Sequence, residues 1–365
     1  MKILFVGGQC VPGIGGVESY MLNMASTLTA LGHDTTIMCS DRKAYTANVD
    51  GIKVVHKVCP KSNTFALPIL FFKSLGYIYK HRRDIDVVNF QAIFLAFIPG
   101  IIVRLFGCKA LYTIHSLAED NPKHGKLMQC LIKIVAFISI HCSGRKVLTI
   151  SESKRDEIKE RYGKDVSVIP CGVDLPLSNP QSDICNRFGI NIGHYYLTIG
   201  RIDPIKNLDI LINAFLQRAD NDYQLVIAGD YENEYGHYLR DLAHANKNII
   251  FVGRVAGSDK EFLLKNCFVN CLVSSSEGMP ISLLEAMAYG KTCIVSNIPA
   301  IREIMHNDWG LWCSVRDIDT LSEQMNIAEK NHDKIVGGNS DMITYVESHH
   351  TWDNIAKKYI DYINS

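Results

Sequence analysis

Short apolar runs alternate along the chain with segments whose apolar residues repeat at helical spacing. In the first half, the apolar runs predict strands over residues 2–6, 34–39, 54–57, 86–89, 109–114, 146–150 and 166–169. In the second half they predict strands over residues 195–199, 224–228, 249–252, 268–273 and 292–296. Helices are expected in the intervals, the clearest at 16–31, 207–218 and 235–245. Strands alternating with helices are typical of α/β proteins with doubly wound parallel sheets.

The pattern is interrupted near the middle of the chain. A proline and a glycine follow the strand at 166–169, and the next residues include Pro176, Pro180 and Ser182. We therefore expect two Rossmann-like domains, residues 1–172 and 173–350, which suits a length of 365 residues. The helix predicted at 353–363 has its apolar residues at near-helical spacing, and we expect it to pack back on the first domain.

Charge divides the chain as the pattern does. Residues 1–174 carry 22 Lys and Arg against 14 Asp and Glu, and residues 175–365 carry 16 against 24. A basic first half favours an anionic partner, either a phosphorylated acceptor or an acidic membrane face, over a nucleic-acid duplex. The alternative is uneven but solvated surface charge. The twelve cysteines form no CxxC pair and no zinc-ligand spacing, which indicates reduced core residues and a cytoplasmic location.

Three stretches are unusually apolar, at 65–79, 92–106 and 127–142, but each is short or broken by a lysine, a proline or a glycine. None is a clean membrane span of ~20 residues. Residues 70–83 and 127–140 combine apolar faces with basic ends, which favours peripheral contact with an anionic membrane, on the inner face of the plasma membrane. The alternative is that both are core helices of the first domain.

Two turns between a strand and a helix carry candidate phosphate ligands. The first contains Gly15 and Gly16, where unpaired amides at a helix start favour a phosphate. Its spacing is neither GxGxxG nor the P-loop pattern, so a dinucleotide oxidoreductase is not indicated. The second contains Arg201 and Lys206, two cations suited to a diphosphate. For each turn the alternative is structural: steric need for glycine in one, surface ion pairs in the other.

Residues 274–290 hold two carboxylates, Glu277 and Glu285, around a predicted helix start near Pro280. Carboxylates accept hydrogen bonds from vicinal hydroxyls in pairs, so these two suit a sugar ring and a ribose. The alternative is helix capping by Glu277 and a solvated Glu285. His115 follows the strand at 109–114, where it is either a ligand-facing residue or a structural histidine.

The ordered set of these segments resembles the retaining glycosyltransferases of family 4, which have the GT-B fold, two Rossmann-like domains facing each other across a donor-binding cleft. The resemblance covers nearly the whole chain. It includes PxxGGxE at residues 12–18, DVVNFQ at 86–91, TIHS at 113–116, TISESKRD at 149–156, VIPCGVD at 168–174, IGRIDPIKNLDILINAF at 199–215, LVIAGD at 225–230, and the E-x7-E pair Glu277 and Glu285. Met279, where an aromatic is frequent, and residues 89–91, in place of an HxH stretch, depart from the commonest pattern.

The resemblance implies roles for residues at the matching positions. The first domain would bind the acceptor and the second the nucleotide sugar, with His115 beside the transferred sugar, Arg201 and Lys206 on the diphosphate, Glu277 on sugar hydroxyls and Glu285 on the ribose. The implied catalytic set is His115, Arg201, Lys206 and Glu277. The implied donor set is Gly15, Gly16, Arg201, Lys206, Arg254, Val255, Glu277, Gly278, Met279, Pro280, Leu283 and Glu285, and the acceptor-side candidates are Glu18, Gln91 and Ser116.

The function expected from this resemblance is retaining transfer of a hexose or N-acetylhexosamine from a nucleoside-diphosphate sugar. UDP is favoured over GDP, and the acceptor is a hydroxyl of a glycan or of a polyprenyl-diphosphate-linked glycan used for cell-surface polysaccharide. No cofactor and no metal are expected, because Asp84 and Asp86 lie at the start of a strand and Asp317 and Asp319 near the C-terminal crossover. The alternatives are a non-hydrolysing nucleotide-sugar epimerase and a catalytically idle nucleotide-sugar-binding protein.

Overall fold

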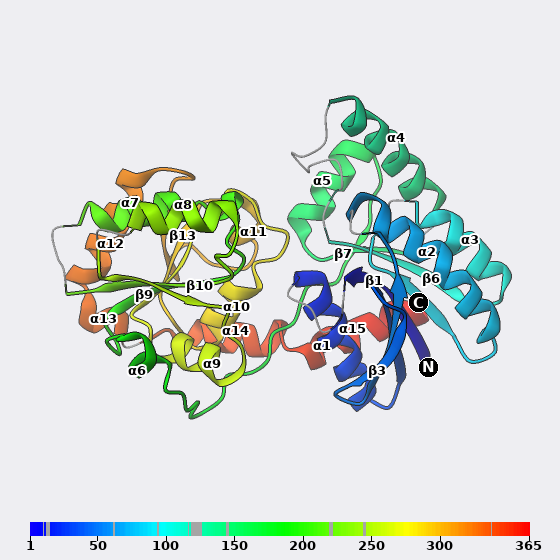
Figure 1. The fold of residues 1–365 in the computed structure, drawn as a ribbon, viewed down its shortest axis with the longest axis horizontal. Coiled ribbons are helices and arrows are strands. Elements are labelled where there is room, and N and C mark those ends of the chain that lie inside the picture. Colours follow the sequence, from blue (N-terminus) through cyan, green and yellow to red (C-terminus); the bar gives the residue numbers. More distant parts are fainter. Residues whose placement is uncertain are drawn as a thin grey trace. The chain divides into compact units, whose positions relative to one another are not determined.

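The computed structural model describes residues 1–9, 11, 15–60, 63–92, 95–115, 117, 126–143, 146–218, 222–243, 246–336 and 338–365. The chain divides into two compact units (Figure 1). Unit 1 consists of Met1–Gly172 and Trp352–Ser365, and unit 2 consists of Val173–Thr351. The last helix of the chain, α15, therefore belongs with the N-terminal residues.

Unit 1 is built on an eight-stranded sheet with the strand order β3-β4-β2-β1-β5-β6-β7-β8. Every neighbouring pair is parallel except β3 and β4, which form an antiparallel pair at one edge. The strands are β1 (Lys2–Gln9), β2 (Asp34–Asp41), β3 (Tyr45–Val49), β4 (Ile52–Val58), β5 (Val87–Phe90), β6 (Lys109–Ile114), β7 (Val147–Thr149) and β8 (Ser167–Val168).

Helices cover both faces of this sheet. Figure 1 shows α1 and α15 together on one face and α2, α3 and α4 on the other, in agreement with their packing. The helices are α1 (Gly16–Ala30), α2 (Asn63–Lys80), α3 (Phe97–Leu105), α4 (Lys126–Cys142), α5 (Glu152–Tyr162) and α15 (Trp352–Asn364). Helix α15 is held by the ring of Tyr359, which stacks on Phe5 and whose hydroxyl accepts a bond from Asn89.

Unit 2 is built on a six-stranded, wholly parallel sheet with the order β11-β10-β9-β12-β13-β14. The strands are β9 (Tyr195–Ile199), β10 (Gln224–Ala228), β11 (Ile249–Gly253), β12 (Val269–Leu272), β13 (Cys293–Ser296) and β14 (Gly310–Cys313). Strands β10, β12 and β13 are buried along their whole length, because helices cover both faces.

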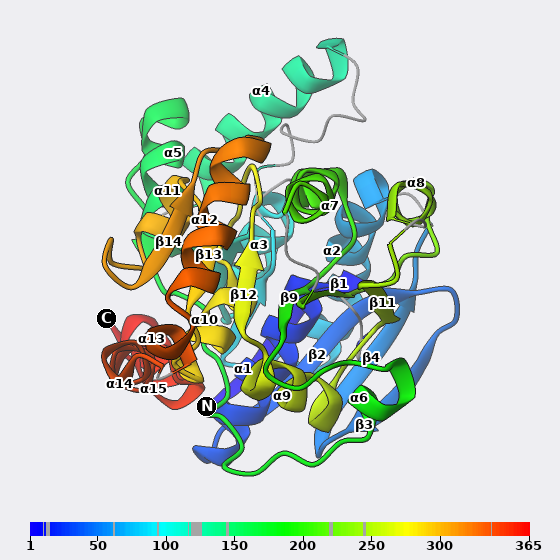
Figure 2. The ribbon, with the colours of Figure 1, turned by 90° about the vertical axis from the view of Figure 1, so that its left-hand side faces the viewer.

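One face of this second sheet carries α7, α8 and α12, and the other carries α9, α10 and α14 (Figures 1 and 2). The helices of unit 2 are α6 (Ile184–Phe188), α7 (Leu208–Leu216), α8 (Glu234–Ala243), α9 (Gly257–Asn266), α10 (Ile281–Ala288), α11 (Pro299–Arg302), α12 (Ile318–Lys330), α13 (His332–Val336) and α14 (Ser340–His349). A short 3₁₀ turn, Pro204–Lys206, precedes α7.

The prediction of two doubly wound α/β sheets is confirmed. Two strands that the sequence did not indicate complete the sheets at their edges, β3 and β14. Both are short, and β3 is largely exposed, so neither has the buried apolar run that marks the other strands. None of the helices in the described ranges combines the length and the apolar character that crossing a membrane requires.

Candidate active site

In unit 2, the loop after β9 is fastened to the loop after β12. Asn207 is fully buried with a φ of 49°, a left-handed conformation that asparagine tolerates better than most residues. Its side-chain amide donates to the carbonyl of Val273 and to the hydroxyl of Ser275, both at 2.8 Å. The backbone amide of Ser275 donates to the carbonyl of Ile205 at 2.8 Å. These bonds bring together two motifs that are about 70 residues apart in sequence.

Lys206 and Glu277 meet where these loops join. The ammonium of Lys206 lies 2.6 Å from Oε1 of Glu277, and the two side chains are 17% and 11% exposed. Glu277 therefore forms an ion pair with Lys206. The N-cap residue of α10 is Pro280, not Glu277. The helix begins at Ile281, one residue after the predicted proline.

A second ion pair lies on the helices that follow β11 and β12. Glu285, in α10, accepts a hydrogen bond of 2.8 Å from the ammonium of Lys260, in the first turn of α9. The sequence predicted a site role for Glu285 but gave no signal for Lys260, which stands within an ordinary polar helix pattern. Lys206, Glu277, Lys260 and Glu285 together are called the paired-charge edge below.

The two predicted arginines are placed differently from Lys206. The side chain of Arg201 is 66% exposed, and its nearest carboxylate oxygen, on Asp203, is 3.8 Å away. Asp203 instead accepts a hydrogen bond from the backbone amide of Ile205, at 3.2 Å. Arg254 forms an exposed ion pair with Asp230, and Val255 beside it is partly exposed. Arg201 is thus a weakly held cation at the end of β9, available to an anionic ligand.

The turn from Glu277 into α10 is mostly buried. Met279, Pro280 and Leu283 are buried, and the backbone amide of Leu283 donates to the carbonyl of Pro280 at 3.0 Å. Gly278 is partly accessible. The packing of these residues fixes the direction of α10 and so the position of the carboxylate of Glu285.

In unit 1, His115 lies where β6 ends and Gln91 lies where the neighbouring β5 ends. Nε2 of His115 is 2.8 Å from Oε1 of Gln91, an arrangement in which Nε2–H donates and Nδ1 carries the lone pair. The ring of Tyr20 packs edge-on against His115 with 4.9 Å between ring centroids. Gln91 fits because Gly7 has no side chain: a Cβ there would come within 2.5 Å of the Cβ of Gln91.

These three residues form an uncharged set, called the neutral edge below. Burial lowers the pKa of His115 to about 4, so the imidazole is neutral at physiological pH. Burial also raises the pKa of Tyr20 well above its ordinary value. The hydroxyl of Tyr20 and the amide nitrogen of Gln91 are buried without a hydrogen-bond partner within the described part of the chain. Such groups are costly unless a ligand or water satisfies them.

The start of α1 holds the predicted glycines. Gly15 is its N-cap, and the carboxylate of Glu18 lies so close that a Cβ on Gly15 would overlap it. The same carboxylate lies beside Gly8, whose φ of 70° favours glycine. Gly16 is exposed and has open space around it. The carboxylate of Glu18 therefore lies beside the N-cap glycine of its own helix. Ser116, the third acceptor-side candidate, lies outside the described residues.

The two DxD segments have structural partners. Asp84 pairs with Lys2 at 3.0 Å, and Asp86 accepts the backbone amide of Lys2 at 2.7 Å, at the amino end of β1. Asp317 caps α12 by accepting bonds from the amides of Asp319 and Thr320. Within the described ranges, no three His, Cys, Asp or Glu side chains cluster in a way that could hold a metal ion.

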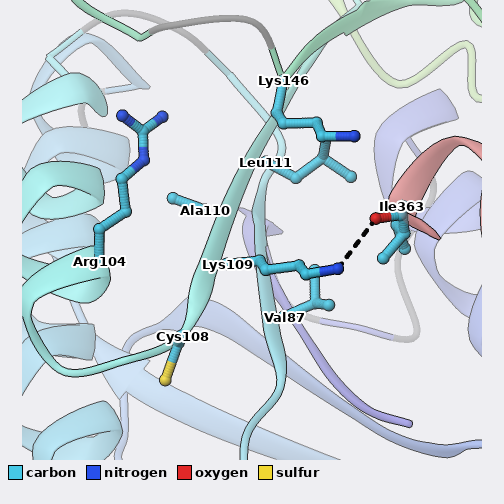
Figure 3. A pocket seen from close by; sticks show the side chains of 8 residues that line it. All are labelled: Val87, Arg104, Cys108, Lys109, Ala110, Leu111, Lys146 and Ile363. Atoms are coloured by element: carbon cyan, nitrogen blue, oxygen red, sulfur yellow. Dashed lines mark hydrogen bonds between the residues drawn. The ribbon is translucent and has the colours of Figure 1, made fainter. Parts of the chain in front are cut away.

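A cavity of about 370 Å³ lies in unit 1 away from these residues (Figure 3). It lies at the amino ends of β5, β6 and β7, whereas His115 and Gln91 follow carboxyl ends. Its lysines cap the end of α15, since Lys109 donates to the carbonyl of Ile363 at 3.1 Å and Lys146 to that of Tyr362 at 2.8 Å. The cavity is therefore not part of the candidate site.

Two family models match the chain. Residues 14–176 match the model of Glycosyltransferase Family 4, and residues 189–349 match that of Glycosyl transferases group 1. A UDP-Gal:alpha-D-GlcNAc-diphosphoundecaprenol alpha-1,3-galactosyltransferase of Escherichia coli is 28% identical, with 92% of this chain and 93% of that protein covered. A phosphatidyl-myo-inositol mannosyltransferase of Mycobacterium tuberculosis is 30% identical, with coverage of 80% and 77%.

A solved structure gives the fold directly. Alr3699/HepE of Anabaena, crystallised with UDP and glucose, superposes with a TM-score of 0.79 over 100% of this chain and 99% of that one, at 18% identity. The two doubly wound units and the matched family models define a glycosyltransferase of the GT-B fold. The chain belongs to glycosyltransferase family 4.

Proposed function

We propose that the protein transfers a sugar from a UDP-sugar to a hydroxyl of a lipid-diphosphate-linked glycan, with retention of anomeric configuration and without a metal ion. The observation that carries this proposal is the ion pair between Lys206 and Glu277 at the carboxyl end of β9. Ligands of open α/β sheets bind at this end of the strands. The activity for which the Escherichia coli relative is named supports both the UDP donor and the diphospholipid acceptor.

On the donor side, Lys206, Glu277 and Glu285 of the paired-charge edge would each contact a different part of the nucleotide sugar. Lys206 is already held by Glu277, and Arg201 is exposed beside it, so a diphosphate would meet one fixed and one adaptable cation. Their charge would stabilise the negative charge that develops on the leaving diphosphate. Glu277 would accept hydrogen bonds from hydroxyls of the transferred sugar, and Glu285 from those of the ribose.

A retaining route is supported by what the carboxylates do. Each is engaged in an ion pair, Glu277 with Lys206 and Glu285 with Lys260, so neither is placed as the free nucleophile of a double displacement. Departure of the diphosphate would leave an oxocarbenium-like sugar. The acceptor hydroxyl would then attack from the same face, forming the new C–O bond as its proton passes to the departing phosphate oxygen.

The neutral edge suits the sugar itself. A neutral His115 with its proton on Nε2 leaves Nδ1 free to accept a hydrogen bond from a hydroxyl. The unpartnered amide nitrogen of Gln91 and hydroxyl of Tyr20 can donate to further oxygens. An imidazolium here would repel the positive charge that builds on the sugar ring, so neutrality favours the transition state.

Metal independence is supported by the cations that the chain supplies in place of one. Lys206 and Arg201 carry the positive charge in the loop after β9, Asp84 and Asp86 are engaged with Lys2, and Asp317 caps α12. No described residue cluster offers a set of metal ligands there.

A peripheral contact with an anionic membrane is supported by α3 and α4, which pack on each other. Apolar side chains at helical spacing are exposed on both helices: Ile98, Ile101 and Leu105 on α3, and Leu131, Ile134, Phe137 and Ile138 on α4. Lys133 and Arg161 line a hollow beside Ile134 and Phe137. Such a mixture of apolar and basic groups suits a lipid surface. In α2, Leu70, Phe71 and Ile78 belong to the core, whereas Phe72 and Tyr79 are exposed.

The function is tested by a donor screen with EDTA present, measuring thermal stabilisation and slow hydrolysis with UDP and GDP sugars for wild type and Glu277→Ala. We expect one UDP-sugar to stabilise and to be hydrolysed, and both effects to disappear in the variant. A product with inverted configuration would overturn the retaining route. Isomerisation of the donor without acceptor would indicate an epimerase, and binding without any turnover an idle protein.

The membrane contact is tested by sedimentation with phosphatidylglycerol vesicles at low salt. The double variant Ile134→Glu/Phe137→Glu should remain in the supernatant while wild type sediments, because two carboxylates replace apolar contact on α4. The matched control is Tyr238→Glu, an exposed aromatic on α8 of unit 2. Recovery of wild type in the supernatant would contradict the contact.

A further inference from the structure

Lys260 lies among three carboxylates. Its ammonium is 2.8 Å from Oε1 of Glu285 and 3.9 Å from the carboxylate of Glu261, and it also interacts electrostatically with Asp174. Burial lowers the pKa of Lys260, but the three carboxylates outweigh burial, and the net result is a raised pKa. Lys260 is therefore firmly protonated.

Glu285 is in the opposite position. Burial raises the pKa of the Glu285 carboxyl, Lys260 lowers it, and the like charges of Glu261 and Asp174 raise it further. The net shift is upward, so the one ammonium compensates only part of the cost of ionising Glu285. The charged form of Lys260 is stabilised by three anions, whereas the charged form of Glu285 is stabilised by one cation.

Among the described residues, Lys260 is the one cation whose charge acts on Glu285. Tyr289, one turn along α10, donates its hydroxyl to Glu261 at 2.6 Å. Strands β12 and β13 bring the buried thiols of Cys271 and Cys293, whose pKa values burial raises well above their ordinary value. Helix α14 also packs on α10, with Met342 and Val346 as its buried residues.

We propose that Lys260 is a positioning residue of the donor site, which keeps Glu285 ionised and holds Oε1 so that Oε2 accepts hydrogen bonds from the donor ribose. The proposal rests on the proposed function of Glu285. A protonated carboxyl would offer one acceptor fewer to a pair of vicinal hydroxyls. Without Lys260, the charges that act on Glu285 would be those of Glu261 and Asp174. The protonated form of Glu285 would then be more populated at neutral pH.

The test is the dissociation constant of UDP, and in parallel of GDP, measured by calorimetry between pH 5.5 and 8.5. Lys260→Met should weaken UDP binding about ten- to a hundredfold at pH 7, the range expected for hydrogen bonds to a charged group. The loss of UDP affinity in Lys260→Met should become smaller as pH rises, because Glu285 of the variant ionises at higher pH. Lys260→Arg should bind within a few fold of wild type, about the variation expected when the charge is kept.

Three further single variants act as references. Lys265→Met removes a lysine of the same helix whose ammonium donates to the carbonyl of Ser178, and it should leave UDP binding unchanged. Glu285→Gln should weaken binding, and adding Lys260→Met to it should have no further effect, because the lysine acts through the carboxylate. Glu261→Gln should move the pH dependence of UDP binding to lower pH, since it removes a like charge from beside Glu285.

The failures are distinguishable. If Glu285→Gln weakens binding but Lys260→Met leaves both the affinity and its pH dependence unchanged, the inference about Lys260 is overturned and the role of Glu285 stands. If Glu285→Gln binds UDP and GDP as wild type does, the proposed role of Glu285 itself fails. If Lys260→Met does not fold, an unshifted pH dependence in Glu261→Gln overturns the inference on its own.

Discussion

The carboxyl ends of the two sheets carry opposite kinds of chemistry. The paired-charge edge of unit 2 consists of four ionised side chains joined as two ion pairs, Lys206 with Glu277 and Lys260 with Glu285. The neutral edge of unit 1 consists of His115, Gln91 and Tyr20, none of them charged at neutral pH. A diphosphate and its departing charge need fixed cations, whereas sugar hydroxyls need neutral donors and acceptors. Under the proposed function, the paired-charge edge would supply charge and the neutral edge would supply hydrogen bonds.

The largest effect is expected from removing a charge of the paired-charge edge. Lys206→Met should lower kcat/KM about 10²- to 10³-fold, because it removes a cation from the leaving group and leaves Glu277, 11% exposed, without its partner. Steady-state kinetics with the donor from the screen measures it. Lys247→Met, an exposed lysine of unit 2, is the control. Activity within threefold of wild type, roughly the effect of a surface change, would contradict the assignment.

The next effect concerns the support beneath Lys206. Asn207→Ala should destabilise the protein by about 2–4 kcal/mol, because it removes buried hydrogen bonds to Val273 and Ser275 and leaves at φ 49° a residue without the polar side chain that makes asparagine tolerant of the left-handed conformation. Asn207→Gly should cost less, since glycine accepts that φ. Urea unfolding of the full chain measures both. Equal stability of the two variants would show that the backbone conformation contributes nothing.

A charge placed in the neutral edge tests whether activity requires a neutral His115. In Gln91→Glu, a carboxylate would lie beside Nε2 of His115 and raise the histidine pKa above its present value of about 4. The imidazolium would then populate at mildly acidic pH, and activity there should fall about tenfold for each unit below the new pKa. Gln91→Met, similar in size and uncharged, should keep the wild-type pH profile. Identical profiles for both variants would refute this role.

In the unmodified protein, the pH dependence of the donor KM should come from Glu285 of the paired-charge edge. Because the pKa of Glu285 is raised, its carboxylate should be lost at a higher pH than an ordinary glutamate loses its charge, so the donor KM should increase on acidification. His115, neutral above about pH 4, should add no inflection between pH 5 and 8. Initial rates over that range measure this. An inflection near pH 6.5 that disappears in His115→Asn would contradict it.

The smallest expected effect is that of chelation. EDTA should leave kcat and KM unchanged, because in the proposed function Lys206 and Arg201 would supply the positive charge at the diphosphate. A loss of activity that magnesium or manganese restores would show instead that the cationic side chains are not sufficient.

The fold followed from the sequence wherever a strand is buried on both faces. Residues 109–114, 195–199 and 224–228 are strands with the predicted bounds, because a continuous apolar run flanked by polar residues has few other uses in an α/β protein. The edge strands β3 and β14 were missed, since exposed pairing leaves no such run.

The site divides in a similar way. Residues within a glycine- or proline-marked turn, such as Lys206 and Glu277, stand out in the sequence, and the structure brings those two together. Lys260 and Asn207 work through partners 25 and 66 or more residues away. One looks like any lysine of an amphipathic helix and the other like a helix start, so only the folded chain shows what each of them holds in place.

The return of α15 to unit 1 makes unit 2 an insertion in the topological sense. The backbone leaves unit 1 after Gly172 and re-enters it at Trp352, and these two residues are in contact: a Cβ on Gly172 would lie 2.8 Å from the Cα of Trp352. The two ends of the interrupted unit thus almost touch. A chain in which residue 172 is spliced directly to residue 352 by a short turn has the connectivity of a continuous Rossmann-like protein, and unit 2 becomes an exchangeable module carried between two neighbouring covalent tethers.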